Sequence, residues 1–201
     1  MQLSRDHQNV CVLALCQALF MTGQSMMFIL AGLVGANLSE NKALATLPIT
    51  VIIVATALTT IPASLLMKRI GRKPGFMLGA IFAIIGGSIA SYGVYNSSFW
   101  IFVIGTMTIG VYGGFAQYYR FAAADVAEAD FKSKAISLVI SGGIIAAFIG
   151  PALANYTFDI HVVPFFGSFV SVSILACLAI LMLGLIDIPR PDFTERASSG
   201  R

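Results

Sequence analysis

Four polar side chains stand within otherwise apolar segments and carry the binding chemistry of this sequence: Gln17, Gln24, Gln117 and Arg120. Gln17 and Gln24 are seven residues apart, so in a helix they share one face. Gln117 and Arg120 are three residues apart and share another face. Because amide and guanidinium groups are costly against hydrocarbon, we expect them to face protein or a water-filled cavity, where they suit a moderately polar solute.

Arg120 allows two interpretations. It lies inside a long apolar segment, where its charge would attract an anionic substrate, a coupling carboxylate or a partner helix. It also lies close to Asp125 at the end of that segment, so its side chain could instead snorkel to the lipid headgroups. No acidic residue occurs deep in an apolar segment, so we predict no proton-coupling carboxylate in this chain.

Residues typical of catalysis or metal binding do not gather in one place. His7 and His161 are predicted near opposite faces of a membrane, and the sequence contains neither a GxSG nor an HExxH motif. The sequence has an odd number of cysteines, and they match no zinc-binding spacing: Cys11, Cys16 and Cys177. We predict that they are free thiols that pack against apolar neighbours. We therefore predict no catalytic residue, no metal site and no cofactor, and we do not expect an enzyme.

The elements that position these residues are membrane helices. The 201 residues are 58% hydrophobic and 10% charged, with a mean hydropathy of +0.89, whereas an ordinary soluble domain is about 25% charged. So few charges cannot cover a water-facing surface, and lipid is the expected solvent. For the same reason the net charge of +3 does not indicate a nucleic-acid partner.

A helix needs about 20 apolar residues to cross roughly 30 Å of hydrocarbon. The uncharged stretch 74–119 is too long for one crossing, and Gly, Asn and Ser within 91–100 predict a turn there. The sequence thus predicts an all-α membrane bundle over residues 1–189, followed by a polar cytoplasmic tail at 190–201. The six predicted spans are 10–36, 44–67, 74–94, 98–124, 133–156 and 163–187.

Charge predicts how the bundle crosses the membrane. With six spans, both termini lie on one side, and eleven Lys and Arg residues fall on that side against Lys42 alone on the other. The positive-inside rule therefore predicts a multi-pass protein of the plasma (bacterial inner) membrane with both termini in the cytoplasm. A cleaved signal peptide over the first span is disfavoured because its uncharged run is too long.

An internal repeat divides the spans into two sets of three. MTG at 21–23 matches TIG at 108–110, PA at 62–63 matches PA at 151–152, and PGFMLG at 74–79 matches PFFG at 164–167. Since each set has an odd number of spans, the two copies are inverted in the membrane, an arrangement typical of secondary transporters.

The loop between the second and third spans, SLLMKRIGRK at 64–73, resembles a family signature. Transporters of the major facilitator superfamily carry roughly G-x-L-A-D-R-x-G-R-K there. The residues that match are Leu66, Arg69, Gly71, Arg72 and Lys73, while Ser64 and Lys68 depart. Independently of the resemblance, Gly71 permits a positive φ for a tight reversal, and Arg72 and Lys73 can reach lipid phosphates or helix C-terminal carbonyls.

Two more stretches extend the resemblance over nearly the whole chain. ISGGIIAAFIGPALAN at 140–155 resembles the helix-five motif centred on Gly150-Pro151, although alanines and Asn155 replace expected glycines. There, Gly143 and Gly150 predict close helix packing and Pro151 predicts a bend. AAADVAEADFKSKA at 122–135 resembles the exit of helix four, but Thr106 replaces an arginine found in many members.

The resemblance implies a cytoplasmic gate formed by Arg69, Gly71, Arg72 and Lys73 with Asp125, which occupies the family's acidic position in helix four. The alternative is that the loop charges only anchor the topology. The resemblance also implies that helices one and four line a central cavity, opposite a second six-helix half. The expected fold is therefore the N-terminal half of a transporter.

Family members normally have twelve helices, and the tail PRPDFTERASSGR resembles the start of their central linker. Four explanations stay open: a chain cut in the linker, a split transporter, a homodimer of halves, or a non-transporting structural or assembly subunit of a larger complex. We expect alternating-access transport of a small organic solute, with membrane lipid and a second half as partners. A lone half would turn its cavity residues toward lipid, so we expect it not to work as a monomer.

Overall fold

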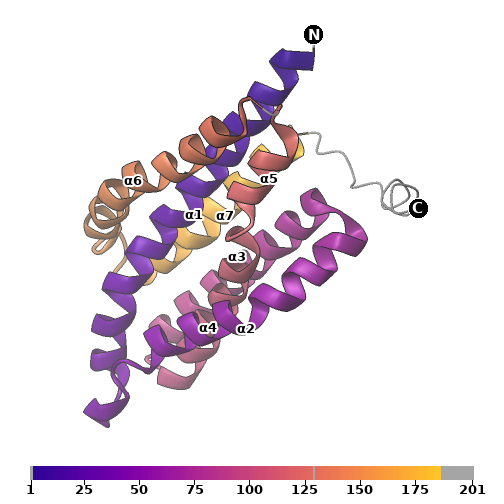
Figure 1. The fold of residues 1–201 in the computed structure, drawn as a ribbon. Coiled ribbons are helices and arrows are strands. Elements are labelled where there is room, and N and C mark those ends of the chain that lie inside the picture. The colour runs from indigo at the N-terminus through magenta and orange to yellow at the C-terminus, as the bar shows by residue number, and fades with distance from the viewer. Residues whose placement is uncertain (1, 129, 187–201) are drawn as a thin grey trace.

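The computed structural model describes residues 2–128 and 130–186, which are helical apart from short connections (Figure 1). The elements are α1 (Gln2–Leu38), the 3₁₀ turn η1 (Lys42–Leu44), α2 (Leu47–Ile70), α3 (Arg72–Tyr95), α4 (Phe99–Ala116), α5 (Tyr119–Val126), α6 (Lys132–Thr157) and α7 (Phe166–Gly184). Within these residues, six helical segments are long and apolar enough to cross a membrane, and α4 and α5 together form one of them. The predicted tail at 190–201 lies outside the described residues.

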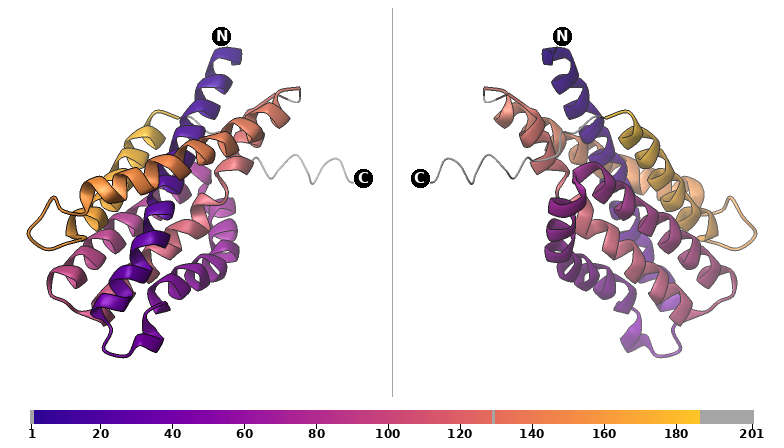
Figure 2. Two further views of the ribbon diagram at one scale, coloured as in Figure 1. Left: turned by 90° about the vertical axis from the view of Figure 1, so that its left-hand side faces the viewer. Right: turned by 90° about the vertical axis from the view of Figure 1, so that its right-hand side faces the viewer.

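The first set of three spans consists of α1, α2 and α3, and the second consists of α4 with α5, α6 and α7. Each set packs mainly against the other one (Figure 2). α1 packs mainly against α6, the equivalent α4 packs against α2 and α3, and α3 lies against α7. Pro62 lies inside α2 and Pro151 inside α6, which are the second helices of the two sets. The bundle is thus all-α and consists of two three-helix repeats, as predicted.

The fourth predicted span is not one continuous helix. The chain turns at Gln117 and Tyr118, between α4 and α5, where the Tyr118 N–H donates to the Phe115 carbonyl at 3.1 Å, a tighter spacing than in an α-helix. The Tyr118 hydroxyl donates to the Thr60 carbonyl of α2 at 3.0 Å. This contact between distant segments stabilises the turn, and hydropathy alone gave no sign of it.

Small residues let the helices approach closely. A Cβ at Gly110 would lie 2.6 Å from the Ile52 carbonyl oxygen of α2, and a Cβ at Gly150 would lie 2.9 Å from the Thr22 carbonyl oxygen of α1. Both distances are impossible for a side chain, so glycine is required for these helix contacts.

On α6 the line of close contact differs from the prediction. It runs through Gly142 and Gly150, because a Cβ at Gly142 would lie 2.8 Å from the Ala14 carbonyl oxygen. At Gly143 an added Cβ would only make an ordinary contact with Met21 of α1 at 3.5 Å, so the predicted packing role of Gly143 stays a prediction. α6 continues through Pro151 to Thr157, so the predicted bend stays a prediction.

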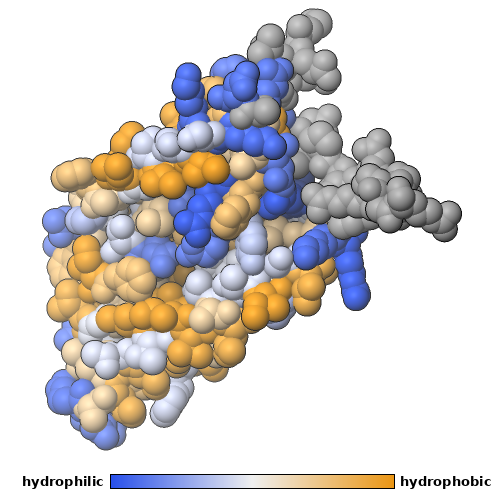
Figure 3. All heavy atoms as spheres, viewed as in Figure 1, coloured by the Kyte–Doolittle hydropathy of each residue, from blue (hydrophilic) through white to orange (hydrophobic). Residues whose placement is uncertain are grey.

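The surface is apolar on its flanks and hydrophilic at both ends (Figure 3). Large exposed side chains on α2 and α6 include Leu58, Ile61, Ile144 and Phe148, each more than 60% exposed. In the middle of the viewed face, hydrophilic atoms interrupt the apolar surface. A water-soluble fold would bury such apolar helix faces, whereas lipid or another apolar partner can cover them.

Candidate substrate site and gate

All four predicted polar residues line one hollow of about 550 Å³. Gln17 and Gln24 come from α1, Gln117 from the turn after α4, and Arg120 from α5. The facing wall comes from α6 and is mostly apolar: Val139, Ile140, Gly143, Ile144, Ala147 and Phe148. Two helical faces that the sequence could only treat separately therefore line one hollow, which has a polar and an apolar wall.

Arg120 brings positive charge to this hollow. Its side chain is exposed, and its Cζ lies 5.0 Å from the centroid of the Phe121 ring, a cation–π distance. The residues that line the hollow include no carboxylate. A guanidinium in this position offers its donors to an acceptor-rich or anionic group.

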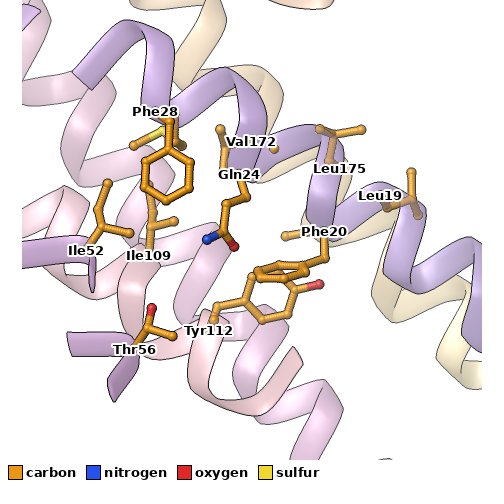
Figure 4. Close-up of a pocket in the computed structure, with 14 residues that line it drawn as sticks. Leu19, Phe20, Gln24, Phe28, Ile52, Thr56, Ile109, Tyr112, Val172 and Leu175 are labelled. Carbon is orange, nitrogen blue, oxygen red and sulfur yellow. The ribbon is translucent and has the colours of Figure 1, made fainter. Parts of the chain in front are cut away.

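Gln24 also borders a smaller inner pocket (Figure 4). This pocket holds about 20 Å³, room for one water molecule, and lies among Phe20, Phe28, Thr56 and Tyr112. Gln24 therefore lies where the inner pocket and the large hollow meet, because it lines both. The amide of Gln24 can donate and accept hydrogen bonds, toward the inner pocket or toward the large hollow.

Tyr112 lines the inner pocket and was not among the candidate residues predicted from the sequence. Its ring packs edge-on against Phe20 with centroids 5.2 Å apart, and its hydroxyl lies 3.3 Å from that of Tyr119. The two buried phenols satisfy each other across the break between α4 and α5. The available signal was a phenol within the apolar, glycine-rich run 105–116, where a buried hydroxyl needs a partner.

The predicted gate loop is built around Gly71. This residue ends α2 and precedes α3 with φ 98° and ψ 161°, a conformation that glycine adopts without steric cost. The predicted positive φ is thus confirmed. Next to it, Arg72 forms an ion pair with Asp125 near the end of α5. Arg69 is exposed in the last turn of α2.

Lys73 connects the same loop to α7. Its ammonium group donates to the Gly184 carbonyl at 3.1 Å and to the Ile186 carbonyl at 2.7 Å. A cation is favourable at a helix C-terminus, where carbonyl groups lack partners. The predicted contact with helix C-terminal carbonyls is therefore confirmed for Lys73, and the loop holds both α5 and α7.

Comparisons with known proteins agree with this architecture. The sequence profile of the Major Facilitator Superfamily matches residues 13–201. The riboflavin transporter RfnT of Brucella anthropi is 41% identical over 184 residues, which make up 91% of this chain and 46% of that protein. The chain thus spans about half the length of this curated relative. Both matches are to transporters rather than enzymes, as predicted, and the chain is a multi-pass membrane protein that belongs to the major facilitator superfamily.

Proposed function

We propose that this chain is one half of a secondary transporter that moves a flavin, or a similar flat heteroaromatic solute, by alternating access. The observation that carries the proposal is the hollow with its polar and apolar walls. Gln117 and Arg120 are exposed in it, which is costly against lipid, so a second six-helix half is needed to cover them. The length of the relative, about twice that of this chain, supports such a half.

The chemistry of the polar wall supports the flavin class. Riboflavin, which the similar protein is named for, has a flat ring system with an edge of carbonyl acceptors and an N–H donor, and a side chain of hydroxyls. The amides of Gln17, Gln24 and Gln117 can each donate and accept, and Arg120 donates. The ring faces are apolar enough to lie against the α6 wall.

The gate residues complete the proposed cycle. We place Arg69, Gly71, Arg72, Lys73 and Asp125 at the cytoplasmic side of the plasma membrane, with both termini. The Arg72–Asp125 ion pair joins the α2–α3 loop to α5, and the first turn of α5 carries Arg120. Breaking the ion pair at the gate and binding a solute at Arg120 would therefore both change the contacts of α5.

The proposal is tested on the complex that forms in the source cells. The chain is given an affinity tag, purified in nanodiscs, weighed by native mass spectrometry, and titrated with riboflavin while flavin fluorescence is recorded. We expect the mass to include a second six-helix half, identical or different, and the fluorescence to be quenched on binding. A large unrelated assembly that contains no second half and binds no riboflavin would overturn the proposal and favour a structural subunit.

A further inference from the structure

The glycines of α6 fall into two kinds. At Gly142 and Gly150, an added Cβ would lie within 3 Å of the backbone of α1, so helix packing excludes any side chain. At Gly143, an added Cβ would lie 3.5 Å from the Cγ and 3.8 Å from the Cε of Met21, which are ordinary contacts. Helix packing therefore does not explain why position 143 has no side chain.

Glycine is also a poor choice for the helix itself. In a helix interior it is less stable than alanine because it loses more backbone freedom on folding. Gly143 lies in the middle of α6 and its φ is not positive, so no local backbone conformation requires it. The remaining candidate reason is the space that the missing side chain leaves free.

That space belongs to the large hollow. Gly143 lines it together with Ile140, Ile144 and Ala147, which lie on the same face of α6 by helical spacing. Gln24 and Arg120 lie on the other wall. A side chain longer than alanine at position 143 would extend from the apolar wall toward the polar one and narrow the hollow.

We propose that Gly143 is a specificity-determining residue that keeps the hollow wide enough for a flat ring system. The ring face lies over Gly143, between the side chains of Ile140 and Ile144, and its polar edge points toward Gln24 and Arg120. This inference rests on the proposed function and adds to it the orientation of the solute and the residue that sets the size limit.

The test compares Gly143→Ala and Gly143→Leu in the purified complex by riboflavin fluorescence titration and by melting temperature. Gly143→Ala is expected to weaken binding a few-fold, and Gly143→Leu by at least about tenfold, because overfilling a site is costly. Neither variant should lower the melting temperature of the wild type, because alanine and leucine are better helix formers than glycine. The matched control is Ala152→Leu on the same helix, because Ala152 is exposed and lies outside the residues that line the hollow, so binding should not change. Wild-type riboflavin affinity in Gly143→Leu would overturn the inference.

A second readout does not depend on the solute. In vesicles, the thiol of Gly143→Cys should react with a water-soluble maleimide, and the site of labelling is mapped by mass spectrometry, which separates it from the exposed Cys11 and Cys177. The thiol of Ala146→Cys, on the same helix, should not react because Ala146 is fully buried. If the wild type binds no riboflavin, the proposed function fails, while a protected thiol in Gly143→Cys would overturn this inference by itself.

Discussion

The residues that distinguish this bundle are polar groups held in apolar surroundings. Gln24 lines both the inner pocket and the large hollow, and Arg120 brings a charge to the hollow without a carboxylate in its lining. A buried or half-buried amide contributes most when it has a partner, because losing the partner leaves the full cost of desolvation. A solute with complementary donors and acceptors would provide that partner.

Gln24→Ala should therefore weaken riboflavin binding by about tenfold, the effect of one hydrogen bond lost in a low-dielectric site. Gln8→Ala is the matched control, because Gln8 is exposed on the same helix and outside both pockets. Fluorescence titration of the purified complex measures both. Equal affinities of the two variants would contradict the placement of the solute at Gln24.

Gly71 makes a different kind of contribution, through its backbone. Its φ of 98° with ψ of 161° lies in a region that is nearly restricted to glycine. Gly71→Ala should lower the free energy of unfolding by about 1–3 kcal/mol because the new Cβ strains the turn. The melting temperature in detergent should fall, whereas Arg69→Ala, an exposed change two residues away, should leave it nearly unchanged. A stable Gly71→Ala protein would mean that the loop can adopt another turn.

Among the α-helices of the described residues, α5 is the shortest, and its two ends make contacts with other parts of the bundle. Arg120 lies in its first turn, and Asp125 near its end forms the ion pair with Arg72 of α3. Tyr119, at its start, packs against Phe76 of α3 with ring centroids 4.5 Å apart. The break at Gln117 and Tyr118 separates α5 from α4, so α5 joins the proposed solute site to the proposed gate.

The contact between α1 and α6 depends on glycines at fixed positions. Gly150→Ala should destabilise the bundle by about 1–3 kcal/mol, because its Cβ would meet Ser25 Cβ at 2.7 Å and force the helices apart. Gly184→Ala, in open space, is the control and should leave the melting temperature unchanged. An unchanged melting temperature of Gly150→Ala would show that α1 and α6 can separate at little cost.

At the scale of the whole molecule, the two ends of the bundle differ in charge. The gate loop, with Lys68 to Lys73, lies at one end, and the turn that contains Lys42 lies at the other. Lys42 donates to the Ala36 carbonyl at 2.7 Å and so helps to close the end of α1. The gate loop carries several Lys and Arg residues and the opposite turn carries Lys42, and the positive-inside rule uses this difference to predict orientation.

This orientation is tested with two exposed positions. After Cys11 and Cys177 are replaced by serine, Glu40→Cys should react with a membrane-impermeant maleimide in intact cells. Arg69→Cys should react only after the cells are permeabilised. The opposite pattern would place the gate loop outside the cell and would contradict both the orientation and the cytoplasmic gate.

The sequence by itself determined the number of spans, their order and the turn at Gly71. A membrane span is predicted from consecutive apolar residues, and a positive φ from a single glycine. Both predictions therefore need only a short stretch of sequence. The loop motif was also sufficient to indicate the family. The sequence also singled out the four polar residues that line the large hollow, because each of them is out of place in lipid.

Only the tertiary structure decided how these pieces meet. Adjacent residues on a helix differ by about 100° in direction, so Gly142 packs against α1 while Gly143 lines the hollow. Which of the two faces inward depends on how α6 is rotated against α1, and that is set by contacts between segments more than a hundred residues apart. Contacts between distant segments also decide two other features. Lys73 donates to the Ile186 carbonyl just after α7, and the break after α4 is stabilised by the hydrogen bond from Tyr118 to the Thr60 carbonyl.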